Sequence, residues 1–238
     1  MPRRSPTQKR TTRPAAAAPT ISPDAARAFS TALRRWFRRN SRALPWRETR
    51  DPYRVLVSEL MLQQTQVSRV VDFYERFLTR FPTLQTLADA RPAHVMEAWE
   101  GLGYYARARN LHKLARHVTR DGADGTLPNH PDALVLLPGV GRYTAGAVAS
   151  FAYERRASLV DTNVARVLAR VFAPRLNPKR PRDLTRLWEI AESVLPRTGK
   201  AAWTHNQAVM ELGALVCTAR VKHCGKCPLA RHCKSVER

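Results

Sequence analysis

A single acid stands inside a strongly apolar stretch of this sequence. Glu59 lies within residues 53–61, where most of its neighbours are tyrosine, valine, leucine or methionine. Ionised carboxylates are rarely fully buried without a partner, because an apolar surrounding replaces the water that stabilises their charge. Glu59 is therefore either one half of a buried ion pair or a carboxyl group with a chemical task, such as proton transfer.

A glycine-containing turn precedes a second acid. Residues 137–146 read Leu-Pro-Gly-Val-Gly-Arg-Tyr-Thr-Ala-Gly, and Asp161 follows in Val-Asp-Thr-Asn-Val. Gly139 and Gly141 would form a tight hairpin at the start of a helix, where free backbone N–H groups can bind a phosphate. A turn without a ligand is the alternative, because glycine clusters mostly mark turns.

All four cysteines lie near the end of the chain, at Cys217, Cys224, Cys227 and Cys233. Their spacing is C-x6-C-x2-C-x5-C, in a segment too short to hold a core of its own. Four closely spaced thiolates can bind zinc or an iron–sulfur cluster, and the spacing alone favours neither strongly. Disulfides are not expected in a chain without a signal peptide, and four free cysteines are the remaining alternative.

Two further segments carry side chains suited to nucleic acid. Gln63-Gln64-Thr65-Gln66 follows the apolar stretch directly, and Tyr104-Tyr105 lies beside Arg107 and Arg109. Aromatic rings can stack on bases, and arginines can bind phosphates. In a purely structural interpretation, the first segment is a polar loop and the tyrosines are half-buried packing residues.

The charge balance of the chain indicates a polyanionic partner. Its 238 residues contain 41 Lys and Arg against 19 Asp and Glu, a formal net charge of +22. Ribosomal and chromatin proteins share this balance with DNA enzymes. A membrane protein is a weaker interpretation, because there is no run of 18 or more apolar residues. We expect a cytoplasmic or nucleoid location, with residues 1–20 as a disordered basic arm that either contacts DNA or is a passive tail.

Helical periodicity dominates the sequence, so the expected fold class is all-α. Ser22-Pro23-Asp24 and Asp51-Pro52 are typical helix starts, with an N-cap before a proline. Glu59 would then lie inside a mostly buried helix. Further helices are expected near residues 67–80, 83–90, 93–99, 104–120, 143–153, 183–195 and 200–216, with a short one from Pro131 and another after Asp161.

Several of these motifs occur together in one known family. Leu137–Gly141 with the later Val160-Asp161 resembles the helix-hairpin-helix and Gly/Pro-Asp signature of the DNA glycosylase superfamily that includes endonuclease III. The segments Leu44–Arg47, Ser58–Val67 and Gly101–Arg107 look most like the A/G-specific adenine glycosylases of the MutY type. The resemblance covers nearly all of the chain beyond the basic arm.

The resemblance implies a two-domain helix-hairpin-helix glycosylase fold. Residues 52–160 would form a helical-barrel domain that contains the hairpin. Residues 21–51 would join 161–238 in an iron–sulfur cluster domain, and the DNA cleft would lie between the two. A [4Fe–4S] cluster held by the four cysteines would order a basic loop against DNA without redox turnover.

The same resemblance implies roles for individual residues. Glu59 would protonate adenine, Asp161 would stabilise or attack the sugar, and Tyr143 would be an active-site hydroxyl. The other implied positions are Asn163, which would orient the carboxylate, the base-pocket residues Gln207, Trp46 and Arg47, the wedge residues Gln64 and Tyr104, and the phosphate-binding residues Gly139, Gly141 and Arg142.

Two departures from the family pattern refine the expected function. The bifunctional endonuclease III branch has a lysine where this chain has Tyr143, so we expect a monofunctional glycosylase. Only five residues follow Cys233, so we expect the C-terminal 8-oxoguanine-reading domain to be missing. The expected activity is base excision repair by a monomer, which removes adenine paired with 8-oxoguanine or guanine in double-stranded DNA.

Other functions stay open at this point. Thr49–Tyr53, Gly141–Thr144 and Val160–Asn163 also resemble thymine mismatch glycosylases, which share the two acids. Removal of thymine or uracil opposite guanine is therefore the alternative activity. A non-catalytic mismatch-binding module is a further alternative, and the presence of both Glu59 and Asp161 weighs against it.

Overall fold

The computed structural model describes residues 20–120 and 125–236. Nearly all of the predicted basic arm lies outside these ranges, and its role stays a prediction. Apart from an isolated bridge between Cys217 and Lys222, the described residues form helices, turns and loops, which confirms the all-α fold. The α-helices are α1 (Pro23–Asn40), α2 (Pro52–Leu62), α3 (Val67–Arg80), α4 (Leu84–Asp89), α5 (Pro92–Ala98), α6 (Ala106–Arg120), α7 (Pro131–Leu134), α8 (Arg142–Phe151), α9 (Thr162–Phe172), α10 (Pro181–Val194) and α11 (Gly199–Leu215), and short 3₁₀ turns are η1 (Pro45–Arg47), η2 (Cys224–Lys226) and η3 (Ala230–His232).

Local sequence signals determine where α1 and α2 begin. The Ser22 hydroxyl accepts a hydrogen bond from the backbone N–H of Ala25 at 3.2 Å. Asp51 accepts from the backbone N–H groups of Tyr53 at 2.8 Å and Arg54 at 3.1 Å. A proline follows each cap. Proline has no backbone N–H, and this costs little in the first turn, because the N–H groups there have no partner within the helix. Both predicted starts are confirmed.

The entry into α6 differs from the prediction by two residues. The helix begins at Ala106 because Tyr104 has a φ of 47°, outside the helical region. Gly101 and Gly103 precede it with φ values of 93° and 70°. Gln64, just after α2, has a φ of 57°. The two expected wedge residues therefore both lie in loops with left-handed backbone, which is unfavourable for side chains larger than glycine.

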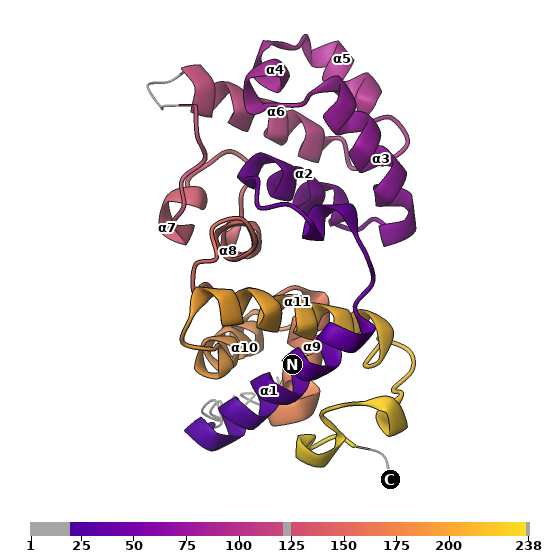
Figure 1. Cartoon of the computed structure of the whole chain (residues 1–238), viewed down its shortest axis with the longest axis vertical. Coiled ribbons are helices and arrows are strands. Elements are labelled where there is room, and N and C mark those ends of the chain that lie inside the picture. The colour runs from indigo at the N-terminus through magenta and orange to yellow at the C-terminus, as the bar shows by residue number, and fades with distance from the viewer. Residues whose placement is uncertain (1–19, 121–124, 237–238) are drawn as a thin grey trace, which may run out of the picture.

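The helices form an upper and a lower group (Figure 1). In the lower group, α1 packs with α10 and α11, and Phe29 of α1 contacts Phe172 of α9, so the first and the last of the described α-helices lie together. The upper group contains α2 to α6, and α8 lies between the groups in contact with α2 and α11. The domain boundaries at residues 51 and 160 stay a prediction. Among the described helices, none combines the length and apolar composition that crossing a membrane requires.

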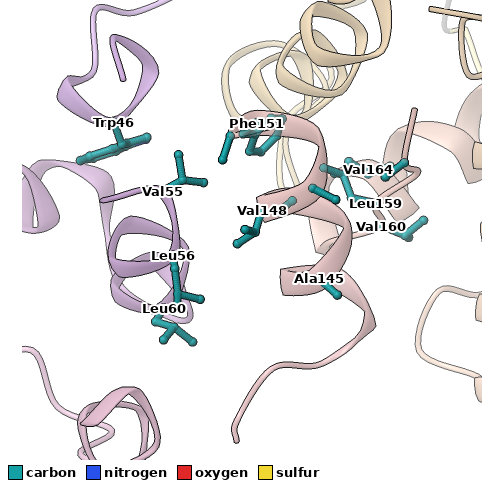
Figure 2. Close-up of a cluster of buried hydrophobic side chains, with 14 of the residues drawn as sticks. Trp46, Val55, Leu56, Leu60, Ala145, Val148, Phe151, Leu159, Val160 and Val164 are labelled. Atoms are coloured by element: carbon teal, nitrogen blue, oxygen red, sulfur yellow. The ribbon is translucent and has the colours of Figure 1, made fainter. Parts of the chain in front are cut away.

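Small side chains in α8 let its neighbours approach closely. Residues 144–151 of this helix are all buried. Figure 2 shows Val55 of α2 facing Val148 of α8, with Leu159 on the opposite side of the helix. This packing fixes the distance between α2 and the segment after α8. Those are the two parts of the chain that carry the acids predicted to do chemistry.

Candidate active site

Glu59 lies in α2 with 4% of its surface exposed. Its Oε2 accepts a hydrogen bond of 2.7 Å from the hydroxyl of Tyr143, the second residue of α8. This partner is a hydroxyl group and not the cation that a buried ion pair needs. Burial raises the pKa of Glu59 to about 7; the Tyr143 hydrogen bond and the charge of Arg47 oppose the rise, and the charge of Asp161 adds to it. Glu59 therefore keeps its proton up to neutral pH.

Asp161 is the N-cap residue of α9, immediately after the apolar segment that follows α8. Its Oδ1 accepts from the backbone N–H of Val164 at 2.6 Å, and its Oδ2 accepts from the side-chain amide of Asn163 at 3.2 Å. Burial raises the pKa of Asp161, while these hydrogen bonds and Arg166 favour its ionised form. Both acids are buried, but Asp161 accepts hydrogen bonds from two N–H groups and Glu59 accepts one from a hydroxyl, so the ionised form is better supported at Asp161 than at Glu59.

Tyr143 lies within electrostatic reach of both acids. Burial and the negative charges of Glu59 and Asp161 raise its pKa well above 10. The hydroxyl therefore stays protonated at physiological pH and donates its hydrogen to Glu59. The structure brings together the three residues for which the sequence predicted a catalytic role.

Asn163 is held in place by a second residue of α9. Nη2 of Arg166 donates to Oδ1 of Asn163 at 2.6 Å and to the carbonyl oxygen of Gly213 at 2.8 Å. Nε of the same arginine donates to the carbonyl oxygen of Cys217 at 2.9 Å. Because its oxygen is occupied, the amide of Asn163 must turn its nitrogen toward Asp161. This geometry supports the predicted orienting role, which stays a prediction.

The expected base-pocket residues do not share one environment. Arg47, in η1, donates from Nε to Oε1 of Gln207 at 2.9 Å, and Gln207 is 5% exposed on α11. Trp46 is 6% exposed and packs edge-on against Tyr74, with ring centroids 5.5 Å apart. Arg47 and Gln207 form one unit near Glu59, whereas the contacts of Trp46 are those of a core residue.

The predicted hairpin connects α7 and α8. Gly139 has a φ of 77°, and a Cβ there would lie 2.4 Å from Cβ of Asn110, so conformation and space both require glycine. Gly141 is the N-cap of α8, and no heavy atom lies within 4 Å of the place a Cβ would take. The first turn of α8 therefore has an open approach for an anion. Arg142 stacks its guanidinium 3.9 Å from the ring centroid of Trp188 in α10.

The two expected wedge residues lie beside one shallow depression. Gln64 and Tyr104 line a volume of about 540 Å³ together with Gln63, Tyr105 and Arg109. Tyr104 is 58% exposed, and the guanidinium of Arg107 lies 5.3 Å from its ring centroid. An exposed ring at the edge of a depression is well placed to stack on a base.

Arg107 is not the phosphate-binding side chain that its sequence neighbours suggested. It is 7% exposed, and Nη1 donates to the carbonyl oxygens of Leu60 and Met61, each at 2.8 Å. Nη2 donates to the carbonyl oxygens of Leu102 at 3.2 Å and Gly103 at 3.1 Å. Arg107 therefore satisfies the free carbonyl groups at the end of α2 and in the loop before α6. Arg109 is exposed and is the arginine of this segment that can reach DNA.

The four cysteines surround one cavity after α11. All four thiols are free, and the cavity is also lined by apolar residues that include Val171, Leu212 and Leu229. Arg170 donates to Sγ of Cys217 at 3.2 Å, and the backbone N–H of Ser235 donates to Sγ of Cys233 at 3.4 Å. Within the described residues, no three His, Cys, Asp or Glu side chains are arranged to hold a single metal ion. Four thiols around one cavity are a donor set that suits a zinc ion or an iron–sulfur cluster.

Residues 57–192, which include Glu59, the hairpin and Asp161, match the HhH-GPD superfamily of base excision DNA repair proteins. The chain belongs to this superfamily.

Curated HhH-GPD relatives include several adenine DNA glycosylases. The rat protein is 43% identical over 89% of this chain, and the one from Mycobacterium tuberculosis is 46% identical over 84%. The chain spans 42% of the length of the rat protein and 65% of the mycobacterial protein. The match therefore covers only part of each relative.

Solved structures of similar proteins support the HhH-GPD fold. A thermostable thymine-DNA glycosylase matches with a TM-score of 0.80 and 30% identity, over 89% of this chain and 96% of its own. An endonuclease III trapped on DNA matches with a TM-score of 0.75 over 91% of this chain and 97% of its own. At 24% identity, the second likeness shows the fold alone.

Sequence reasoning missed two residues of this HhH-GPD site. Glu211 and Trp188 bind Arg47 and Arg142, respectively, from distant parts of the chain. A signal for Glu211 was present, because it is an acid within the largely apolar end of α11, as Glu59 is within α2. Nothing in the sequence singled out Trp188.

Proposed function

We propose that this chain is a monofunctional DNA glycosylase that removes adenine paired with 8-oxoguanine or guanine. The observation that carries the proposal is the pair of unlike acids: Glu59 has a pKa raised to about 7, and Asp161 accepts hydrogen bonds from N–H groups. The identity to curated adenine DNA glycosylases supports adenine as the base.

The reaction breaks the bond between the base and the sugar, so it needs an acid on the side of the base and an anion on the side of the sugar. A purine is a poor leaving group until a ring nitrogen is protonated, and the buried carboxyl of Glu59 is the proton donor. Departure of the base leaves an oxocarbenium-like sugar, which the carboxylate of Asp161 stabilises or traps, as carboxylates do in glycoside hydrolysis. Asn163 holds that carboxylate, and water completes the hydrolysis.

The target adenine must first leave the base stack. The open first turn of α8 with Gly139, Gly141 and Arg142 grips the DNA backbone, and Arg47 with Gln207 receives the flipped base. Gln64 and Tyr104 enter the gap in the stack from their shared depression. The enzyme acts as a monomer on double-stranded DNA in the cytoplasm or nucleoid.

The cysteine cavity holds a [4Fe–4S] cluster in this proposal. Cys217, Cys224, Cys227 and Cys233 would bind the irons, and the bound cluster would supply structural order to the loop. Arg170 donates to one of the four sulfur atoms, as hydrogen-bond donors around such clusters do. The ordered loop presents basic side chains, such as Lys226 and Arg231, toward DNA.

Removal of thymine or uracil opposite guanine is the second candidate. The observation that favours it is the likeness to the thymine-DNA glycosylase structure, which extends over 96% of that chain. Adenine is favoured because the identity to the adenine glycosylases is higher, at 43–46% against 30%.

A panel of labelled duplexes tests the two activities against each other. The duplexes carry adenine opposite 8-oxoguanine, adenine opposite guanine, thymine opposite guanine and uracil opposite guanine. We expect single-turnover release of adenine from the first two and severe loss of release in Glu59→Gln, because an amide cannot protonate a purine. Release of thymine or uracil with adenine untouched would assign the chain to the second activity. DNA binding without any base release would indicate a mismatch-binding module.

A further inference from the structure

Glu211 is a buried acid that takes no part in the proposed chemistry. It lies in α11 with 1% of its surface exposed. Its oxygens accept from the backbone N–H and Nε of Arg42, each at 2.9 Å, and from Nη2 of Arg42 at 2.7 Å. Nη2 of Arg47 also donates to it, at 2.8 Å. Burial acts to raise the pKa of Glu211, but the two arginines lower it to about 2, so the group is ionised.

These contacts fasten the segment between α1 and α2 to α11. Arg42 and Arg47 are five residues apart, and Nη1 of Arg47 donates to the carbonyl oxygen of Arg42 at 2.9 Å. A bidentate arginine pairs with a carboxylate in a fixed geometry, because its planar N–H groups match the two oxygens. The guanidinium of Arg47 is therefore held in one orientation by a side chain that is itself immobile.

The orientation of the Arg47 guanidinium determines which amide atom of Gln207 can form a hydrogen bond with a base. Gln207 and Glu211 are four residues apart on α11, so they lie on the same face of the helix. Arg47 bridges them, since its Nε donates to Oε1 of Gln207 at 2.9 Å. With the oxygen of the amide occupied, its nitrogen is the part left to donate to a bound molecule.

We propose that Glu211 is a positioning residue for the base pocket, which acts through Arg47 to fix the amide orientation of Gln207. Without the carboxylate, Arg47 is free to turn, and Gln207 presents its oxygen and its nitrogen in a mixture of orientations. The inference rests on the proposed function, because it assumes that a flipped base enters between Glu59 and Gln207. Glu211 also supplies the counter-charge for Arg47, whose own charge acts on Glu59.

The test measures two quantities for a duplex with adenine opposite 8-oxoguanine. These are the single-turnover rate constant at saturating enzyme and the Kd for a duplex with an uncleavable adenine analogue. In Glu211→Gln we expect the rate constant to fall about 10-fold to 100-fold, because a misplaced contact slows chemistry strongly. The Kd should stay within about twofold, because affinity comes mainly from phosphate contacts. Equal losses in both quantities from a folded variant would show that Glu211 supports DNA binding as much as chemistry and would overturn the proposal.

A double-variant cycle separates positioning from other effects. If Glu211 acts through Gln207, the double variant Glu211→Gln and Gln207→Met should be no slower than the slower single variant. Rate losses that multiply would overturn the proposal. Glu154→Gln is the matched control, because Glu154 pairs with Arg50 at the surface, and we expect its rate to be that of the wild type.

A second variant decides the matter if Glu211→Gln does not fold. Arg47→Lys keeps a cation for Glu211, but a single ammonium group cannot also reach the amide of Gln207 in the same geometry. Its rate loss should likewise fail to multiply with that of Gln207→Met, and multiplication would overturn the proposal. A wild-type protein that releases no base would overturn the proposed function itself, whereas normal release with multiplying losses would overturn only the role of Glu211.

Discussion

The raised pKa of Glu59 has a direct consequence for the pH dependence of base release. The proposed reaction needs Glu59 protonated and Asp161 ionised, so the rate constant should fall as pH rises through about 7. Above that value we expect a loss of about tenfold per pH unit. Single-turnover rates between about pH 6 and pH 9, with the Kd measured at each pH, check this. A flat profile would remove Glu59 as the proton donor.

The same pKa affects folding stability with a defined sign. The folded protein binds the Glu59 proton more tightly than the unfolded chain, whose value is 4.5. The free energy of unfolding should therefore decline as pH rises from 4.5 through about 7. Glu59→Gln has no proton to lose, so it should lack this part of the decline in denaturant titrations.

Asp161→Asn should separate catalysis from binding. We expect a loss of base release of about 10²-fold or more, since a neutral amide cannot stabilise a cationic sugar. DNA affinity should not weaken, because the change removes a negative charge from a site that faces phosphates. Asn can still cap α9, and Asp51→Asn, the same change at the cap of α2, is the control. A wild-type rate in Asp161→Asn would exclude the acid from the mechanism.

In the proposed function, Tyr143 should limit the reaction to base removal. A hydroxyl cannot form the imine that precedes strand cleavage, so the product should be an intact abasic strand that breaks only on later heat or alkali. Borohydride should trap no covalent adduct with the wild type, and Tyr143→Lys should gain some trapping and nicking. Efficient trapping by the wild type would contradict this expectation.

At the scale of elements, the two hairpin glycines have different reasons to be glycine. An alanine at position 139 would have to adopt a φ of 77°, and its Cβ would clash with the side chain of Asn110. For Gly139→Ala we therefore expect a loss of about 1 to 3 kcal/mol in the free energy of unfolding. At Gly141 the φ is an ordinary −91° and the space for a Cβ is open, so Gly141→Ala should leave the free energy of unfolding unchanged. Denaturant unfolding of both variants checks the difference, and equal losses would contradict it.

The helices were predictable from sequence because their signals are local. A cap such as Asp51 and the proline after it act within a few residues, so the starts of α1 and α2 agree with the prediction. The late start of α6 was not predictable, because Arg107 holds the loop before it through carbonyl groups from another helix. Arg142 and Trp188 are likewise adjacent only in the folded chain.

The site, like the helices, could be predicted from sequence only where its signals are local. Glu59 and Asp161 were identifiable because an acid in an apolar stretch is rare and because the motifs around them are contiguous. Their partnership through Tyr143 depends on the packing of α8 against α2, which no short motif encodes. Glu211 was overlooked because its two arginine partners lie about 165 residues earlier in the chain.

At the scale of the whole molecule, the cysteine loop ties the end of the chain to the lower helix group. The purified protein should be yellow-brown with about four irons per chain. Cys224→Ser should lose metal and lower the thermal stability of the loop, because the loop has little core of its own. Iron analysis and limited proteolysis of the loop measure both effects. One zinc per chain without iron would overturn the cluster assignment.

Arg107 gives the upper helix group an uncommon mechanical property. One buried guanidinium joins the ends of two loops, and these loops carry the exposed Gln64 and Tyr104. In the proposed function, the two tips would therefore enter DNA as one braced wedge and not as two independent loops. The distortion would fall on the stacked bases, which resist it least where a mispair has already loosened them.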